Sequence, residues 1–464
     1  MRRRLHLRVL LAFVALFAVV GAGLVTPVDE RPYDAWDTYR QTMGELNEEG
    51  LRAARGFLEA GFGKASLTPR LDGSAPDWRT GVFPDLPLAG FSERRGASAT
   101  GVHDPLWVKT IALRVRGQTV VLTSLDMLIV PPSVSELVAA RLPSAGLSRD
   151  QLYLSATHTH SGPGGWGKDW VTRLVAGPYH EGVERWIAQQ ALISIEAALE
   201  NLRPASMGEA WVNIPDLVKA KKEGESHPGF PLLLFRQIDG REAVLGAYAA
   251  HPLFLSSDNR QLSGDYPGAW QRAMEERGFD LAMFMAGPMG GQSATDSGNT
   301  FSAAESFGRR LADRVGQASS TVEYRRSTEL AALGLEVVLP DPQIRLTEDW
   351  RIRPWAARSL LPLKENTFLQ AIRVGRTILL STPADYAGEL AIRLEEEVRD
   401  LDVNLAVTSF NGDYIGYIMP SKYYHSGMYE TRVMSFYGPE MGEFTKEVLA
   451  QMARVLTNAR DDTS

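Results

Sequence analysis

The chain has 464 residues, with 49 lysines and arginines against 56 aspartates and glutamates, and its formal net charge is −7. A chain of this length can bury a substantial core in one large or two medium domains. The acidic balance, without a long Lys/Arg tract, argues against a nucleic-acid partner. The absence of cysteine excludes disulfides, thiolate metal ligands and a cysteine nucleophile. Any bound zinc must therefore be held by nitrogen and oxygen atoms.

The N-terminus combines a basic segment with an apolar run. Arginines within residues 1–8 precede the uncharged residues 9–25, and Asp29 and Glu30 follow. This pattern predicts a signal anchor or a cleaved signal peptide over residues 1–27, with the N-terminus in the cytoplasm. In both cases we expect the body of the protein outside the cytoplasm, either membrane-anchored or secreted.

The remaining chain divides into two parts. Residues 28–60 are rich in Glu, Arg, Leu and Ala and contain few helix breakers, so we expect a helical stalk there. Residues 61–464 contain no Gly/Ser/Pro-rich linker and no internal repeat. They are therefore predicted to form a single large domain.

Strand and helix patterns mix throughout this domain. Alternating or continuous apolar runs predict strands at residues 108–115, 119–125, 152–154, 243–250, 281–285, 373–380 and 405–409. Longer periodic runs predict helices at residues 134–141, 183–202, 303–315, 387–399 and 444–456. The mixture predicts an α/β (mixed α+β) fold in which layered sheets are flanked by helices.

Two histidines stand at the end of one predicted strand. Residues 155–165 read Ser-Ala-Thr-His-Thr-His-Ser-Gly-Pro-Gly-Gly, so His158 and His160 precede a Gly/Pro-rich turn. Because alternate side chains of a strand point to one face, we expect these two imidazoles to project together. Imidazole is a common metal ligand, and a second imidazole can shuttle a proton. Two ordinary loop histidines are the alternative.

Further polar residues follow other predicted strands. They are His251, Ser293, Asp385 and Tyr417. Rigid sheets often carry catalytic groups at their strand ends. Each residue also has a structural interpretation, since His251 can end a strand and Asp385 can cap the next helix. Tyr417 can be a core aromatic, but the joint arrangement favours a shared site.

Five motifs occur in order along the first half of the domain. They read Gly-Phe-Gly-Lys-Ala-Ser-Leu-Thr-Pro at 61–69, Leu-Ala-Gly-Phe at 88–91 with Gly-Val-His-Asp-Pro-Leu-Trp at 101–107, Ala-Thr-His-Thr-His-Ser-Gly-Pro at 156–163, His-Pro at 251–252 and Ser-Gly-Asp at 263–265. Together they resemble the neutral/alkaline non-lysosomal ceramidase family, zinc amidases that cleave ceramide into sphingosine and a fatty acid. The resemblance spans roughly residues 61–458.

The resemblance implies a role for each candidate residue. It implies one Zn²⁺ per chain, bound by two imidazoles, a carboxylate and a phenol oxygen: His158, His251, Asp385 and Tyr417. It further implies that His160 assists near the scissile bond. Tyr429, twelve residues after Tyr417, would contact the substrate carbonyl. Ser293 takes the place of the family serine, either as the nucleophile or as a group that orients water.

The sequence also departs from the family pattern. Asp385 replaces a glutamate, and Gly291 and Ala294 replace the residues that flank the serine. Ile214 stands where the family has an arginine that acts at the substrate. The nearby lysines 219, 221 and 222 have no assigned role. Because isoleucine cannot donate the hydrogen bonds of a guanidinium, we expect amide hydrolysis with ceramide as a poor substrate.

The sequence therefore predicts a zinc-dependent amidohydrolase that uses metal-activated water on a ceramide-like or other N-acyl lipid. Its expected partners are a lipid or small-molecule substrate and, through the N-terminal segment, a membrane. One alternative is a hydrolase of a different acyl bond in an envelope or small-molecule substrate. Another is a catalytically silent binding protein on the same scaffold.

Overall fold

The computed structural model describes residues 23–461, apart from residues 47–50, 223 and 297. In this part of the chain, no helix has the length and apolar character needed to cross a membrane. Most of the apolar run at residues 9–25 lies outside the described residues. Its role as an anchor or signal peptide therefore stays a prediction.

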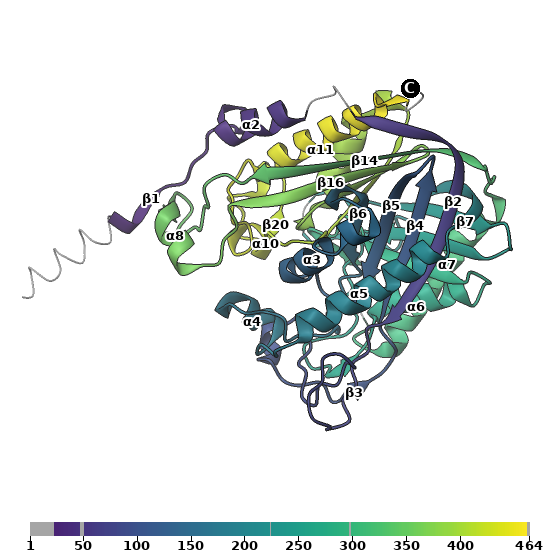
Figure 1. Ribbon diagram of the computed structural model, residues 1–464. Helices are drawn as coiled ribbons and strands as arrows, with labels where there is room; N and C mark the ends of the chain where they lie inside the picture. Colours follow the sequence, from purple (N-terminus) through teal and green to yellow (C-terminus); the bar gives the residue numbers. More distant parts are fainter. Residues whose placement is uncertain (1–22, 47–50, 223, 297, 462–464) are drawn as a thin grey trace, which may run out of the picture.

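One 13-stranded β-sheet folds into two parts that pack face to face, here called the first and the second sheet, with helices over their outer faces (Figure 1). The first sheet has the strand order β6 (Leu152–Ala156), β5 (Gln118–Leu125), β4 (Trp107–Val115), β2 (Arg52–Ser66), β7 (Arg203–Asn213), β9 (Gly229–Gln237), β10 (Glu242–Tyr248) and β12 (Leu281–Ala286). The second has the order β14 (Ser327–Val338), β16 (Asn366–Val374), β17 (Thr377–Ser381) and β19 (Asn404–Thr408). Strand β2 pairs with β14 and so joins the two sheets. The predicted mixed α/β class is confirmed.

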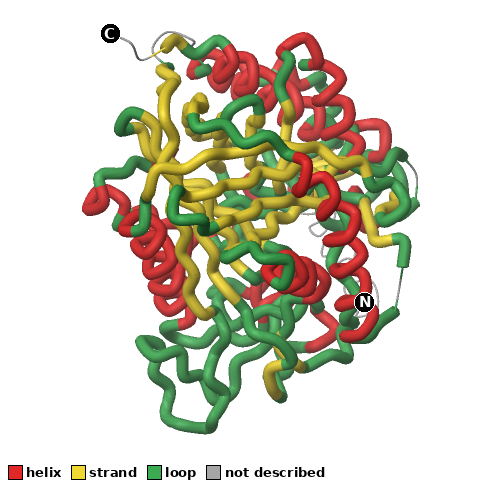
Figure 2. The backbone as a smooth tube through the Cα atoms, turned by 90° about the vertical axis from the view of Figure 1, so that its right-hand side faces the viewer, coloured by secondary structure: helices red, strands yellow, loops and turns green. Residues whose placement is uncertain are grey.

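Three apolar clusters separate the layers. One lies between the sheets and includes Leu113 and Leu379. A second lies under α5 (Val183–Glu200), α6 (Asp265–Glu275) and α7 (Phe301–Thr321). The third lies under α9 (Gly388–Glu397) and α11 (Met441–Thr457). Burying one such leucine contributes about 1.5–3 kcal/mol, so these clusters hold the layers together. Figure 2 shows the strands and the loops that extend from them.

Helix α7 illustrates how the sequence builds one of these layers. The Thr300 side chain accepts a hydrogen bond from the Ala303 N–H and caps the helix. Buried positions such as Phe307 and Leu311 recur at helical spacing and face α6. Gly308 permits the close approach of α7 to α6, because a Cβ at this position would lie 2.7 Å from the backbone nitrogen of Trp270.

The structure corrects the prediction of a helical stalk over residues 28–60. Helix α2 covers only Asp37–Glu45, and the chain from Arg52 onward belongs to β2. Backbone pairing of β2 with β4, β7, β14 and β21 (Arg460–Asp461), together with burial of Ala53 and Ala54, outweighs the helical propensity of this segment. The predicted boundary at residue 61 consequently falls inside a strand.

Candidate metal centre

Three histidines meet where two strands of the first sheet end. His158 and His160 follow β6, and His251 follows β10. The Nε2 atom of His158 lies 2.9 Å from Nε2 of His251 and 3.2 Å from Nε2 of His160. One ligand atom from each residue lies within 4.8 Å of the others, so the cluster can hold a metal ion.

The opposite ring nitrogens contact backbone carbonyls. Nδ1 of His158 lies 2.6 Å from the Leu128 oxygen, and Nδ1 of His160 lies 3.1 Å from the Gly90 oxygen. When these Nδ1–H groups donate, the Nε2 lone pairs point at one another. Lone pairs at this distance repel, and a cation satisfies them together. Carbonyl-oriented imidazoles of this kind are typical of metal ligands.

The two histidines of the His-Thr-His motif converge for a different reason than predicted. Strand β6 ends at Ala156, and His158 has a left-handed backbone with φ of 64°. A loop turn, not strand alternation, therefore brings the imidazoles together. Phe410 also has positive φ, 63°, and its ring stacks on His158 at 3.7 Å with an interplanar angle of 5°. Such strained positions cluster at functional sites.

Asp385 reaches His158 from a separate two-stranded sheet, in which Tyr417 lies beside it. Strands β18 (Asp385–Tyr386) and β20 (Tyr417–Ile418) pair in parallel, with Asp385 opposite Tyr417. The Oδ1 atom of Asp385 lies 3.9 Å from Nε2 of His158. The other oxygen, Oδ2, accepts a hydrogen bond of 2.7 Å from the Tyr414 hydroxyl. The helix cap that follows is Ala387, so Asp385 is not the N-cap of α9.

One oxygen of the Asp385 carboxyl group shows whether this site suits a metal ion. Oδ1 of Asp385 is buried and has no hydrogen-bond partner among the described residues. An unpaired buried carboxylate oxygen costs free energy unless a cation or donor meets it. Because it faces His158 Nε2, a cation between the two would satisfy both atoms. The donor set therefore fits a bound metal.

Burial controls the protonation of the cluster. Desolvation lowers the pKa of His158 to about 3 and holds the pKa values of His160 and His251 well below the usual range. The imidazoles are thus neutral at pH 7, the form that binds metal. Desolvation also raises the pKa of Asp385 to about 7, against hydrogen bonds from Tyr414 and Tyr417. A cation at Oδ1 would favour its ionised form.

The other predicted site residues lie at different depths. Tyr429 begins α10 (Tyr429–Arg432), is 56% exposed, and its ring centroid lies 6.4 Å from that of Tyr417. Ser293 belongs to β13 (Gln292–Ala294) and pairs opposite Lys219. Within the described residues no hydrogen bond joins Ser293 to the histidines. Ile214 is buried in the apolar core beneath the first sheet.

Sequence reasoning left one charged residue without a role. Lys221 follows β8 (Val218–Ala220), and its backbone N–H donates to the Gly291 oxygen at 2.8 Å. Its Nζ lies 3.4 Å from a carboxylate oxygen of Glu430, next to Tyr429. The positive charge of Lys221 contributes to the lowered pKa values of the three histidines and opposes the rise in the pKa of Asp385. A cationic side chain therefore stands beside the histidine cluster.

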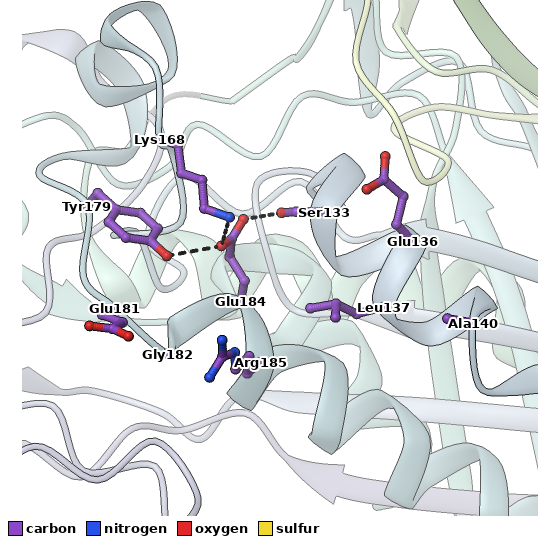
Figure 3. A pocket seen from close by; sticks show the side chains of 10 residues that line it. All are labelled: Ser133, Glu136, Leu137, Ala140, Lys168, Tyr179, Glu181, Gly182, Glu184 and Arg185. Carbon is purple, nitrogen blue, oxygen red and sulfur yellow. Dashed lines mark hydrogen bonds and ion pairs between the residues drawn. The ribbon is translucent and has the colours of Figure 1, made fainter.

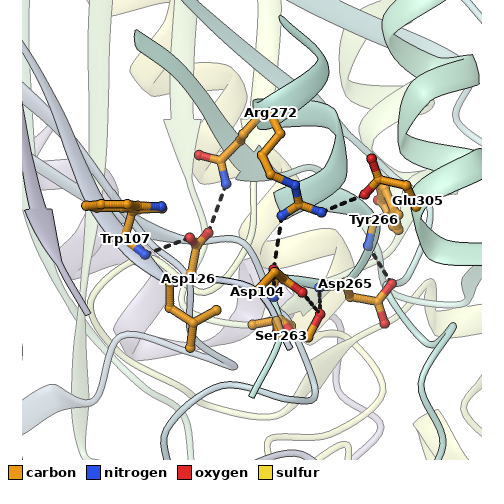
Figure 4. A network of polar contacts seen from close by, with 12 residues as sticks. Asp104, Trp107, Asp126, Ser263, Asp265, Tyr266, Arg272 and Glu305 are labelled. Atoms are coloured by element: carbon orange, nitrogen blue, oxygen red, sulfur yellow. Dashed lines mark hydrogen bonds and ion pairs between the residues drawn. The ribbon is translucent and has the colours of Figure 1, made fainter. Parts of the chain in front are cut away.

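Two of the sequence motifs support the histidine loop instead of entering the site. Asp104 accepts hydrogen bonds from Ser263 and from Arg272 (Figure 4). Ser263 in turn holds the loop, since its oxygen accepts from the Thr159 hydroxyl at 2.7 Å and its N–H donates to Ser161 at 3.0 Å. This network fixes the residue between the two histidines.

A separate cavity of about 610 Å³ lies between α3 (Pro132–Ala139) and the start of α5. Figure 3 shows Glu184 at its wall. The Glu184 carboxylate pairs with Lys168 at 2.8 Å and accepts from Ser133 and Tyr179. With these partners the carboxylate is satisfied. It holds the segment that contains Lys168 and Tyr179, which follows the histidines, against α5.

Comparison with known proteins identifies relatives of this chain. Residues 73–300 match the family model described as neutral/alkaline non-lysosomal ceramidase, N-terminal. This range contains His158, His160, His251 and Ser293. The chain is 29% identical over 251 residues to neutral ceramidase 1 of Arabidopsis thaliana, a match that covers 47% of this chain and 31% of that protein.

A second relative has a solved structure. Neutral ceramidase of Pseudomonas aeruginosa is 24% identical over 249 residues, covering 48% of this chain and 35% of that protein. A crystal structure of neutral ceramidase from the same species superposes with a TM-score of 0.72 at 17% identity, covering 88% of this chain and 76% of that chain. The sequence matches thus span about a third of the curated relatives, while the shared fold extends over most of this chain.

Proposed function

The chain belongs to the neutral/alkaline non-lysosomal ceramidase family, and from this premise we propose that it is a zinc-dependent amidase that cleaves the N-acyl amide bond of a ceramide-like or other N-acyl lipid. The observation that carries the proposal is the convergence of three buried Nε2 atoms, with an unpaired carboxylate oxygen 3.9 Å from that of His158. Nitrogen and oxygen donors in this number suit Zn²⁺ with a position left open.

The proposed ligands are two imidazoles, a carboxylate and a phenol oxygen: His158, His251, Asp385 and Tyr417. When bound there, Zn²⁺ acidifies water and polarises the amide carbonyl. His160 has its Nδ1 held by a backbone carbonyl, so its Nε2, which faces the cluster, would take a proton and return it to the leaving amine. Tyr429 would donate a hydrogen bond to the carbonyl oxygen as charge develops there.

Ser293 is retained in the proposal as the nucleophile or as a group that orients water. The Gly290 N–H donates to the Tyr386 oxygen at 2.8 Å, so the turn before Ser293 runs beside Asp385. Single-turnover assays with Ser293→Ala separate the two roles. A nucleophile would be essential for acyl transfer, whereas an orienting group would leave slower hydrolysis.

Metal analysis of the purified protein tests the centre directly. We expect one zinc per chain, and loss of both zinc and amidase activity in His158→Ala. His227→Gln is the matched control, because His227 is equally buried but pairs with Glu395. Substoichiometric metal in the wild type, or zinc retained by the His158 variant, would contradict the proposed site.

A panel of N-acyl lipids and simpler N-acyl amines tests the reaction. We expect amide hydrolysis, measured as release of the free amine. Hydrolysis confined to esters or other acyl compounds would favour the alternative acyl hydrolase. Full zinc occupancy without turnover on the whole panel would instead support a silent binding protein.

A further inference from the structure

Large apolar side chains are exposed together at one end of the molecule. Figure 1 shows α4 (Trp170–Ala176), α8 (Pro354–Leu360) and β1 (Val25–Pro27) at this end. The side chains, here termed the apolar face, are Trp170, Leu174, Leu346, Trp350, Trp355 and Leu360. The three tryptophans are 58%, 46% and 59% exposed, respectively. Large apolar side chains exposed near one another in this way mark an interaction site.

Hydrogen bonds join the parts of the apolar face. The indole N–H of Trp170 donates to the Leu360 oxygen at 3.2 Å and ties α4 to α8. The Leu346 N–H donates to the Trp350 oxygen at 2.8 Å within the preceding turn. The face is therefore one surface held in place by the fold, although its members come from distant parts of the chain.

The N-terminal chain enters the folded body at this face. Strand β1 pairs antiparallel with β15 (Trp350–Ile352), and Pro27 lies opposite Trp350. The Arg353 N–H also donates to the Leu24 oxygen at 2.8 Å. The uncharged run at residues 9–25 thus ends among the exposed tryptophans. A run held in a bilayer would place these side chains at the lipid headgroups, where tryptophan is favoured.

One wall of the candidate site continues into the face through α10. Arg432 donates to the Leu346 oxygen at 2.7 Å, which fixes α10 beside the face. The ring of Tyr429, on the same helix, lies edge-on to that of Tyr417, with centroids 6.4 Å apart. Val433, which follows α10, is also exposed.

The opposite wall continues into α4. The Gly90 N–H donates to the Val175 oxygen of α4 at 2.8 Å, and the Gly90 oxygen contacts His160 Nδ1 at 3.1 Å. The histidine cluster is therefore flanked by elements that carry the apolar face. Exposed charges beside the face have both signs, for example Arg353 and Glu348, so a neutral surface suits it.

We propose that the apolar face docks on the headgroup boundary of a lipid bilayer and presents the histidine site to lipids that leave it. Docking itself rests on the exposed tryptophans and the entry point of residues 9–25. Delivery of substrate from the bilayer rests in addition on the proposed amidase function. The occupant is the surface of a neutral phospholipid membrane.

Tryptophan fluorescence of the full chain tests docking without any assay of activity. The protein is reconstituted with phosphatidylcholine vesicles whose acyl chains are brominated or unmodified, since bromine quenches nearby tryptophans. The chain has 10 tryptophans and none within residues 1–25, so quenching reports on the folded body. We expect quenching in the wild type, less in each of W170F, W350F and W355F, and almost none in the triple variant.

Trp107→Phe is the control, because Trp107 packs under Lys64 at the start of β4 and should leave quenching intact. No quenching in the wild type, or equal quenching in the triple variant, would overturn docking. A dimer that dissociates in the triple variant would assign the face to a second copy instead. If the triple variant loses hydrolysis of an N-acyl lipid in vesicles but still hydrolyses a dispersed short-chain amide, delivery of substrate from the bilayer is supported. If the wild type hydrolyses neither substrate, only the amidase proposal is contradicted.

Discussion

Two residues in left-handed backbone conformations stack at the centre of the site. A non-glycine residue in this conformation costs about 1–3 kcal/mol and persists only where its surroundings enforce it. Here the Leu128 oxygen and the Phe410 ring hold His158, and Asn411, which follows Phe410, donates to the Leu154 oxygen of β6. The second sheet thus fixes a ligand that the first sheet supplies. Neither contact could be inferred from the His-Thr-His spacing alone.

Tyr414 is a positioning residue for the proposed metal centre. Its hydroxyl donates to Oδ2 of Asp385 at 2.7 Å and so directs Oδ1 toward His158. Tyr414→Phe keeps the ring and removes this bond. Loss of an outer partner of a ligand typically lowers metal affinity by about 10–100-fold, which competition with a chelator would measure. Tyr423→Phe, which removes a bond to Glu389, should leave affinity unchanged; an equal loss in both variants would refute the role of Tyr414.

Asp265 makes stability depend on pH. Burial raises its pKa from 3.8 to about 7, although the N–H groups of Tyr266 and Leu255 donate to it. Because the folded state favours the protonated form, its contribution is complete below pH 4 and is lost as the pH rises through 7. Asp265→Asn should remove this dependence. The melting temperature of the variant relative to wild type should therefore be higher at pH 8 than at pH 5, and a constant difference would contradict the assignment.

At the scale of elements, short pairings connect the loops that carry the site. Strand β18 places Asp385 beside Tyr417 of β20, and β8 places Lys221 next to the turn before Ser293. These pairings involve strands of two or three residues, too short to show periodicity in a sequence. The longer elements were predicted well, for example β4, β5 and α5, because their apolar patterns extend over more residues.

Lys221 is predicted to act on substrate through its charge. Lys221→Met keeps most of the side-chain length and removes the cation beside the histidines and Glu430. We expect kcat/KM for an N-acyl lipid to fall by about 10–100-fold, in line with losing a charge-assisted hydrogen bond, while zinc content is unchanged. Lys219→Met is the control, since Lys219 points to the Thr295 oxygen. Unaltered kcat/KM in Lys221→Met would exclude this role.

At the scale of the whole molecule, the layered α/β class followed from the mixture of strand and helix patterns. The start of the domain did not, because residues 52–60 have a helix-like composition but lie in a strand shared by both sheets. Composition reports local preference, whereas a strand with partners on both edges is fixed by segments far along the chain. His158, His160 and His251 could be predicted because their motifs are local. Lys221, Tyr414 and Phe410 could not, because only contacts between segments distant in sequence bring them to the histidines.

The strand β2 sets where the folded body begins. Its first half pairs with β14 and β21, and its second half pairs with β4. A chain that begins at residue 61 would lose the strand segment that joins the sheets and expose Ala331 and Leu330 of β14, which are fully buried. We expect this chain to aggregate, whereas a chain that begins at residue 28 keeps α2, β2 and the contact of Trp36 with Phe444 at 5.7 Å. Thermal unfolding and size-exclusion chromatography of the two chains measure the difference, and cooperative unfolding of the shorter chain would restore residue 61 as the domain boundary.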